Sequence, residues 1–374
     1  MKIVIIGAGF GGLETCFRLR RLLKDRHDEI ILISDIHYFL FRPSLIWIPF
    51  REREISDISL PLKEIIKDTN ITFMHKRVTR IVPQKQMVEL DDNETVHYDY
   101  LVIASGAELD FQQINGDTKK IHSIYTIEGA LKVRQEIQKI ADGDSIVIGS
   151  CAGNPNPSPS YEFTFELHAY LQKKNINASI TYFTSEDQLF HFAISESTEH
   201  VTKLMNKKGI TYFTDTTVTK MTDHHVQLSN HQVIPYTFLL VIPPYKGADF
   251  ILNSELHHEN GLLRVKETLQ SEEWENIFVV GDACILPKRE RVKSGRAAEL
   301  QGSIAAENIF SKMTKRTKQK NYEDQVVSIV ETGTDGGMLS VLTKHLEIHT
   351  NGSTPHVMKI MLEKYYLQKL KGQK

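Results

Sequence analysis

The chain has 374 residues, of which 41% are hydrophobic, and its 45 basic residues nearly balance 47 acidic ones. This length predicts two or three domains, each large enough to bury a core. The near-neutral charge argues against duplex nucleic acid as a partner, because such binding needs a clustered basic surface. The 3 cysteines lie far apart without a CxxC pair, so neither a disulfide framework nor a structural zinc site is indicated, and a reducing, cytoplasmic compartment fits.

Two strand-to-glycine patterns follow each other along the chain. Residues 1–7 form an apolar run that ends in glycine, which predicts a buried parallel strand entering a phosphate-binding turn, with a helix and a second strand at 29–35 behind it. Another buried strand is predicted at 98–104. The pattern then repeats with strands at 144–149 and 178–184, and a further strand at 276–282 ends in Gly-Asp.

These elements predict an α/β fold with two tandem Rossmann-like domains and a short C-terminal helical element. We assign 1–110 to the first part of a cofactor-binding domain, 111–235 to a second dinucleotide-type domain, and 236–311 to the second part of the first domain. Residues 312–374 form the C-terminal region, which begins with a basic run interpreted as a solvated linker.

The first glycine turn predicts a nucleotide site. Gly7, Gly9 and Gly12 satisfy GxGxxG directly after a predicted strand, and Asp35 ends the next strand. Such glycines permit a tight turn and a close approach of backbone N–H groups to a pyrophosphate at the helix N-terminus. The carboxylate can accept hydrogen bonds from ribose hydroxyls.

Two later segments resemble the remaining marks of flavoproteins with two dinucleotide domains. They are the turn from Ala104 to Gly106 and the pair Gly281-Asp282. The resemblance implies FAD as the cofactor, with the Gly-Asp carboxylate at the ribityl or phosphate region of the flavin. It also implies that the Ala-Ser-Gly turn packs where the chain crosses between domains.

Several segments resemble, in order and spacing, those of the sulfide:quinone oxidoreductases. They lie at 37–44, 98–106, 161–163, 243–247, 260–265 and 363–366, so the similarity covers nearly the whole chain. The resemblance implies a flavin that accepts electrons from a small reductant, sulfide in that family, and passes them to a membrane quinone. It also implies that Pro43 lies near the isoalloxazine ring.

The redox cysteines of that family are replaced here. By register with the matching segments, their positions fall on Tyr125, Asn156 and Ser328, and none of these side chains can form a persulfide. Cys151 is the nearest substitute, because a helix N-terminus could lower the pKa of its thiol, although a small buried apolar role is the alternative interpretation. We therefore expect no cysteine sulfur relay, and instead direct hydride transfer or thiolate attack on the flavin.

Two polar residues match the family and are candidate proton carriers. They are Glu162 and His191, because a partly buried carboxyl or imidazole near a redox centre can titrate close to neutral pH. The alternatives are a helix-start carboxylate and a surface histidine. The adjacent histidine pairs at 224–225 and 257–258 fit no familiar ligand spacing, so no metal is predicted.

Two other functions stay open. An NADH-dependent quinone reductase needs a second GxGxxG, but Cys151 and Asn154 stand where its second and third glycines belong. Residues 298–302 nevertheless resemble the quinone-side helix of the single-subunit NADH:quinone oxidoreductases. We interpret this segment first as a helix that packs over the flavin, with contact to a quinone as the alternative. A non-catalytic flavin-binding protein is the third interpretation.

The C-terminal segment 355–371 predicts an amphipathic helix. Its apolar arc consists of Val357, Met358, Met361, Leu362, Tyr365 and Tyr366. Packing against the flavin domain and weak docking on a membrane surface both explain such an arc. We thus expect a cytoplasmic protein, with peripheral membrane contact and a homo-oligomer left open.

Overall fold

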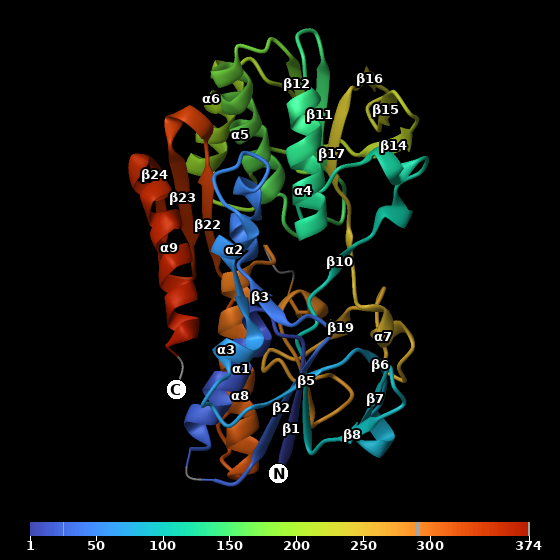
Figure 1. Ribbon diagram of the computed structural model, residues 1–374, viewed down its shortest axis with the longest axis vertical. Helices are drawn as coiled ribbons and strands as arrows, with labels where there is room; N and C mark the ends of the chain where they lie inside the picture. Colours follow the sequence, from blue (N-terminus) through green and yellow to red (C-terminus); the bar gives the residue numbers. More distant parts are fainter. Residues whose placement is uncertain (25, 289–291, 373–374) are drawn as a thin grey trace.

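The computed structural model describes residues 1–24, 26–288 and 292–372. Two α/β domains lie one above the other along the long axis, and a sheet with a long helix runs along one side of both (Figure 1). The prediction of two Rossmann-like domains is confirmed, because each domain is built on a parallel sheet.

The first sheet contains strands whose side chains are buried on both faces, as expected for parallel strands covered by helices. Its order is β20 (Ile277–Val279), β9 (Tyr100–Ile103), β1 (Lys2–Ile6), β2 (Glu29–Ser34) and β5 (Thr72–His75). β20 is contributed by a segment far from the others in sequence, and the strands of the second sheet lie between them along the chain.

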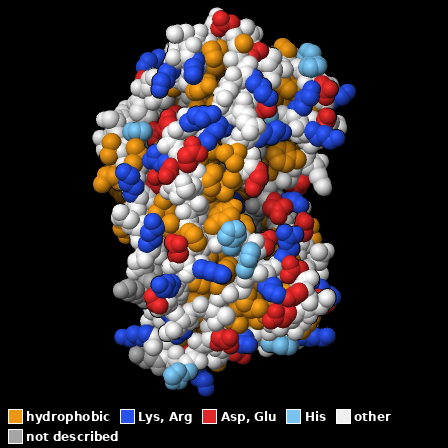
Figure 2. Space-filling view, viewed as in Figure 1, with side chains coloured by type: hydrophobic (Ala, Val, Ile, Leu, Met, Phe, Trp, Pro, Cys, Tyr) orange, Lys and Arg blue, Asp and Glu red, His pale blue; other side chains and the backbone are white. Residues whose placement is uncertain are grey.

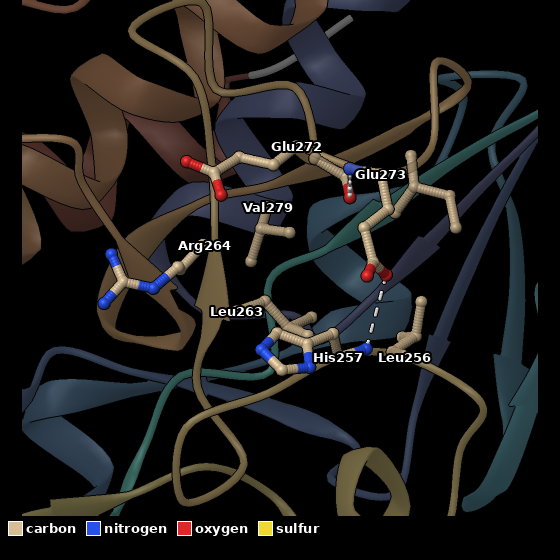
Figure 3. Close-up of a pocket in the computed structure, with 9 residues that line it drawn as sticks. Leu256, His257, Leu263, Arg264, Glu272, Glu273 and Val279 are labelled. Carbon is tan, nitrogen blue, oxygen red and sulfur yellow. Dashed lines mark hydrogen bonds between the residues drawn. The ribbon is translucent and has the colours of Figure 1, made fainter.

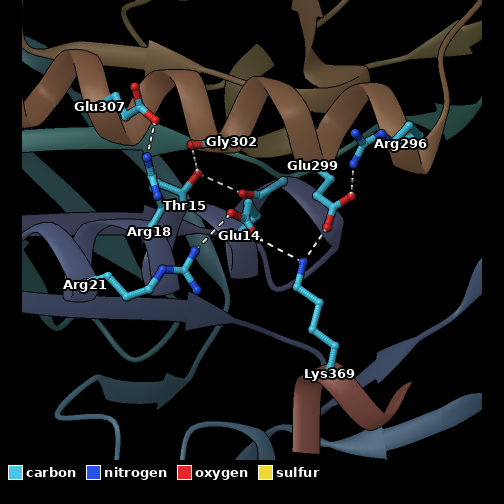
Figure 4. A network of polar contacts seen from close by, with 10 residues as sticks. Glu14, Thr15, Arg18, Arg21, Arg296, Glu299, Gly302, Glu307 and Lys369 are labelled. Atoms are coloured by element: carbon cyan, nitrogen blue, oxygen red, sulfur yellow. Dashed lines mark hydrogen bonds and ion pairs between the residues drawn. The ribbon is translucent and has the colours of Figure 1, made fainter. Parts of the chain in front are cut away.

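Helices α1 (Phe10–Leu22) and α8 (Gly295–Met313) pack tightly beside this sheet. Gly302 permits the approach, since a Cβ there would overlap the carbonyl oxygen of Gly11. The Thr15 hydroxyl donates to the Gly11 carbonyl at 2.7 Å and lies 3.2 Å from the Gly302 carbonyl. On the outer side, Lys369 bridges the two helices from the C-terminal helix (Figure 4).

The second sheet has the order β13 (Thr211–Phe213), β12 (Ser179–Thr184), β11 (Ser145–Ser150) and β17 (Phe238–Ile242), all parallel. Helices α4 (Ile127–Glu136), α5 (Ser158–Lys174) and α6 (Ser195–Lys207) belong to this domain. β17 lies within the range 236–311 that the sequence assigned to the first domain, so that range begins in the second sheet and returns to the first only afterwards.

Short elements complete the two domains. Two three-stranded antiparallel sheets are formed by β6 (Val78–Val82), β7 (Met87–Leu90) and β8 (Thr95–His97), and by β14 (Val218–Met221), β15 (His225–Leu228) and β16 (Val233–Pro235). Paired short strands are β3 (Tyr38–Leu40) with β4 (Ser59–Pro61), β10 (Glu108–Leu109) with β18 (Tyr245–Lys246), and β19 (Leu263–Arg264) with β21 (Cys284–Ile285). The short helices are α2 (Ile55–Ile58), α3 (Leu62–Ile65) and α7 (Asp249–Leu252).

The C-terminal region is more than the helical element that the sequence predicted. It contains an antiparallel sheet of β22 (Val326–Glu331), β23 (Gly337–Leu342) and β24 (Glu347–Gly352), followed by α9 (Ser353–Lys371). The hydrogen bonds of this sheet join residues of the C-terminal region to each other, and β22 also contacts α5 of the second domain.

α9 is oriented differently from a usual amphipathic surface helix. Tyr366, one member of the predicted apolar arc, packs inward against Phe10 and Phe39, with ring centroids 5.0 and 5.6 Å apart. The other five members are exposed, with Met361 at 63% and Tyr365 at 64%. The buried side of the helix carries Leu367 and Leu370 with Tyr366, and also two charged residues, Lys359 and Glu363.

Among the described residues, no helix combines the length and apolar character that crossing a membrane requires.

Candidate functional site

The predicted cofactor residues meet at one edge of the first sheet. β1, β9 and β20 run parallel, with Ile6 in register with Ile103 and Ile103 with Val279. Their carboxyl ends therefore bring three turns together, those that begin at Gly7, Ala104 and Gly281. Ligands of open parallel sheets bind at this edge.

The glycines of the first turn are required by its geometry. Gly7 has a φ of +99°, and a Cβ on it would overlap the carbonyl oxygen of Ala104. A Cβ on Gly12 would overlap the carbonyl oxygen of Gly7. At Gly9, by contrast, a Cβ would meet no atom of the described chain within 4 Å. Gly9 precedes the first turn of α1, so open space lies in front of a helix N-terminus, where an anion is favoured.

Other polar groups around this edge fit a dinucleotide. Asp35 follows β2, is 49% exposed, and lies 3.5 Å from the Arg77 side chain, so its carboxylate stays accessible. The hydroxyls of Ser44 and Ser105 are buried and have no hydrogen-bond partner among the described residues. Ser105 belongs to the Ala104–Gly106 turn and Ser44 follows Pro43. Space beside a helix N-terminus together with buried polar atoms lacking partners is consistent with FAD.

The segment around Pro43 lies close to the late aspartate. Pro43 is exposed in a 3-10 helix (Arg42–Trp47), and the Arg42 guanidinium lies 4.8 Å from the ring centre of Tyr125. The Tyr125 hydroxyl is 3.4 Å from Asp282 Oδ2. Burial and the negative charge of Asp282 raise the pKa of Tyr125 to about 12, so this tyrosine stays protonated and donates to the carboxylate. A side chain at a predicted cysteine position thus orients Asp282.

Sequence reasoning missed one buried residue of this edge. Gln301, fully buried on α8, accepts the backbone N–H of Gly281 at 2.7 Å. This bond fixes the Gly-Asp turn, whose glycine has a φ of +70°. From the sequence, the segment 298–302 is interpreted only as a packing helix or a quinone contact. The one sequence feature that could have indicated this role is a glutamine among the small and apolar residues of the predicted helix.

The cysteines do not form a redox site. Cys16, Cys151 and Cys284 are all buried. Burial raises the pKa of Cys151 to about 11, so the predicted lowering by a helix N-terminus is not found, and its sulfur packs in an apolar cluster. The Asn156 side chain accepts the Ser158 N–H at 3.2 Å, in the turn that leads into α5.

Glu162 is buried on α5 and pairs with Lys359 of α9. It also accepts the backbone N–H of Glu331 at 3.1 Å. Burial raises the pKa of Glu162 and the ammonium of Lys359 opposes that shift. Lys359 additionally lies 4.8 Å from the ring centre of Trp47, which ends the 3-10 helix containing Pro43. The sequence gave no indication that Lys359 would pair with Glu162.

His191 lies apart from these groups. Its ring is exposed and pairs with the exposed Asp187. Its backbone N–H donates to Glu186 Oε1 at 2.8 Å. The contacts of the described chain therefore give His191 a surface position and do not bring it to the sheet edge.

The acidic residue after the second strand of the second domain is engaged within the protein. Glu186 follows β12, at the position where an acidic residue would meet a ribose. Its carboxylate accepts from the Tyr161 hydroxyl at 2.6 Å and from the Thr184 hydroxyl at 2.9 Å. Because its acceptors are taken by the protein itself, this carboxylate is not available to a nicotinamide nucleotide.

A small pocket lies elsewhere in the first domain (Figure 3). Leu263 and Val279 form its apolar wall, while His257, Arg264 and Glu273 stand at its polar side. Among the described residues, its lining contains none of the predicted cofactor residues, and we assign it no role in the reaction.

Comparison with known proteins places this geometry in context. Residues 1–302 match the family described as pyridine nucleotide-disulphide oxidoreductase. The chain is 29% identical to the sulfide-quinone reductase of Aquifex aeolicus over 99% of this chain and 91% of that protein. It is 28% identical to the demethylphylloquinone reductase of Synechocystis over 91% and 87% of the two chains.

Solved structures agree. The X-ray structure of the sulfide:quinone oxidoreductase from Aquifex aeolicus superposes with a TM-score of 0.93 at 27% identity, covering 100% of this chain and 92% of that one. The structure of NDH2 from Plasmodium falciparum in complex with NADH superposes with a TM-score of 0.78 at 16% identity, covering 99% and 94%, and shows the shared fold alone.

Proposed function

The chain belongs to the pyridine nucleotide-disulphide oxidoreductase family, and from that premise we propose that it passes electrons from a sulfide- or thiol-class reductant through FAD to a quinone. It is a FAD-dependent oxidoreductase resembling sulfide:quinone oxidoreductase. The observation that carries the proposal is the convergence of the Gly7, Ala104 and Gly281 turns around the open space at Gly9.

Each residue of this edge has a binding or orienting role. The N–H groups at the start of α1 would hold the pyrophosphate, and Asp35 would accept from the adenosine ribose. Asp282, held by Tyr125, would meet the ribityl or phosphate region, with Pro43 beside the ring system. When bound, FAD supplies the group that accepts two electrons and gives them up again.

The reductant has to reach the cofactor without a protein thiol. By the resemblance, Tyr125, Asn156 and Ser328 stand at the family's redox-cysteine positions, and a tyrosine, an amide and an alcohol cannot exchange with a disulfide. Cys151 does not replace them, because burial keeps its sulfur protonated. Direct hydride transfer or direct attack by a donor thiolate is therefore the proposed chemistry.

Glu162 is the proposed proton carrier for the quinone. Reduction of a quinone to a quinol takes up two electrons and two protons, and a buried carboxyl with a raised pKa can hold one of those protons near neutral pH. Lys359 positions this carboxyl through their ion pair. His191, with its ring exposed beside Asp187, has no contact among the described residues that supports the same role.

We further propose that the exposed face of α9 lies on a membrane surface, from which a quinone would come. The exposed members of the arc are apolar, and α9 lies along one edge of the molecule (Figure 1), where hydrophobic atoms reach the surface (Figure 2). A contiguous apolar face of this kind on a water-soluble surface marks an interaction site.

Vesicle co-sedimentation tests this docking. The wild-type protein should sediment with phosphatidylcholine–phosphatidylglycerol vesicles, and Met361→Asp should stay in the supernatant. Gln232→Asp, at an exposed position between β15 and β16 of the second domain, is the matched control and should still sediment. Equal binding of both variants, or no binding of the wild type, would contradict the proposal.

Anaerobic stopped-flow spectroscopy tests the electron path. Oxidised protein should lose its flavin absorbance when mixed with sulfide or a small organic thiol, and regain it when a quinone is added. NADH should bleach the flavin slowly, because Glu186 and the residues at 151 and 154 disfavour its binding. Protein that stays colourless after reconstitution with FAD would overturn the proposal, and rapid bleaching by NADH would instead assign it to the NADH-dependent enzymes.

A further inference from the structure

A cluster of ionisable side chains lies where α5, β22, α9 and the loop after the first 3-10 helix pack together. Its members are Glu52, Glu162, Glu166, Glu331, His356 and Lys359. Glu162, Glu166, Glu331 and Lys359 are buried, whereas Glu52 is exposed and His356 is partly exposed. The cluster therefore extends from solvent to the buried pair at Glu162.

Glu331 is the link between the two ends. Its carboxylate is 2% exposed, and its Oε2 lies 2.8 Å from the Nδ1 atom of His356. Its backbone N–H donates to Glu162. Its other oxygen, Oε1, is buried without a hydrogen-bond partner among the described residues. A buried carboxylate oxygen without a hydrogen-bond donor is costly unless a water molecule reaches it.

The charges of the cluster do not balance. Four carboxyls face one lysine and one histidine, and the nearby Arg53 is occupied by Glu363, whose two oxygens it meets at 3.0 and 3.2 Å. Among the charged groups that affect the pKa of Glu52, Lys173 has the smallest effect. Several buried carboxylates at close range cannot all ionise. The cluster must therefore retain a proton at neutral pH.

Glu166 is the carboxyl best placed to retain it. It lies one helical turn after Glu162 on α5, and no hydrogen bond within the described chain compensates its burial in the way that Lys359 compensates that of Glu162. Burial, followed by the charges of Glu52, Glu162 and Glu331, raises the pKa of Glu166 to about 8. The ammonium of Lys359 lowers the pKa of Glu166, but its effect is smaller than that of burial or of any of the three carboxylates.

We propose that His356 and Glu331 form the solvent end of a proton-uptake route to Glu162, with Glu166 as the proton store beside it. The inference rests on the proposed function, because quinone, two electrons and two protons give one quinol. A proton passes from water to His356 and across the 2.8 Å contact to the Glu331 carboxyl, and a water molecule at the open Oε1 of Glu331 would carry it to Glu162, which supplies the quinone oxygen. Each group returns to its starting state when the next proton enters.

Enzyme reduced with dithionite and then mixed with a quinone isolates this step from the choice of donor. In His356→Ala, reoxidation of the flavin should slow about 100-fold or more, because proton transfer by a positioned side chain contributes roughly 10²- to 10⁴-fold. Added imidazole should restore most of the rate, which a purely structural role would not predict. His345→Ala, an exposed histidine on the turn between β23 and β24, is the matched control and should behave as wild type.

Glu331→Gln gives a second variant that keeps the size of the side chain. It should slow reoxidation as His356→Ala does, without rescue by imidazole, since the block lies further inward. Normal reoxidation in both variants, or equal slowing in His345→Ala, would overturn the route.

Infrared spectroscopy of the resting protein tests the proton store without turnover. Wild-type protein at pH 7 should show a protonated carboxyl band that is lost in Glu166→Gln, and its presence in that variant would contradict the store. If reduced wild-type protein does not pass electrons to any quinone, the proposed function fails and the proton route fails with it. The infrared band still decides, in that case, whether the cluster holds a proton.

Discussion

Replacing Glu166 with glutamine should change how the stability of the protein depends on pH. In the folded chain the pKa of Glu166 is raised to about 8, whereas an unburied glutamate has a pKa of 4.5. Between these values the native state binds more protons than the unfolded state, so the free energy of unfolding falls as pH rises. The glutamine side chain of the variant does not ionise and lacks this dependence.

The magnitude follows from the same two values. Each pH unit within the window is worth about 1.4 kcal/mol, so the wild type should lose about 2.5 kcal/mol of stability through Glu166 between pH 5 and 7. Because neighbouring carboxyls titrate with Glu166, this amount belongs to the cluster as a whole. The buried amide of the variant adds a cost of about 1–3 kcal/mol that does not depend on pH. The difference between the two slopes, and not either absolute stability, is therefore the prediction.

Urea unfolding at pH 5, 6 and 7, followed by the fluorescence of Trp47 and Trp274, measures both slopes. Glu166→Gln should become more stable relative to wild type as pH rises. Glu347→Gln, which changes an exposed glutamate of β24, is the control and should keep the wild-type slope. If wild type and Glu166→Gln differ by a constant amount at all three pH values, Glu166 does not hold a proton and the reasoning is refuted.

Three further changes have expected outcomes. Lys359→Met leaves the carboxylate of Glu162 buried and unpaired, and should lower the free energy of unfolding in urea by about 3–5 kcal/mol. Adding Glu162→Gln should restore much of this stability. No restoration would show that loss of the ion pair is not the cause. Gly12→Ala places a Cβ against the carbonyl oxygen of Gly7 and should yield protein with little bound FAD. The ratio of flavin to protein absorbance measures this, and full occupancy by FAD would contradict the role assigned to the turn. Lys369→Ala should cost less than about 1 kcal/mol, because this bridge to α1 and α8 is 28% exposed, and a larger loss of thermal stability would mean that the bridge holds α9 in place.

The parallel sheets could be predicted because their strands are apolar on both faces and end in glycine. The turn at Gly7, the strand that ends at Ala104 and the strand before Gly281 were each predicted from a local pattern, and the parallel register then brought their ends together. A binding turn that depends on consecutive residues can be predicted from the sequence. The pairing of Tyr125 with Asp282 is not, because the two residues come from segments far apart in the chain.

The C-terminal region shows why the remainder could not be predicted. A helical period identifies an apolar arc, but it does not say whether the protein buries that arc or exposes it. The inward side of α9 also depends on residues from distant segments, Glu162 of α5, which pairs with Lys359, and Arg53, which pairs with Glu363. Cys151 is a related case, because the apolar cluster around its sulfur comes from distant strands and overrides the effect expected from a nearby helix N-terminus.

The reversed orientation of α9 has a consequence for how this helix tolerates mutation. At most surface helices the inward positions accept only apolar residues and the outward positions accept almost any. Here the inward positions Lys359 and Glu363 are each tied to one specific partner of opposite charge, so even a well-fitting leucine should be rejected at either of them. A saturation screen of α9 scored only for soluble, folded protein would accept polar residues freely at Met361 and Tyr365, and the same screen scored in the presence of lipid would select against them.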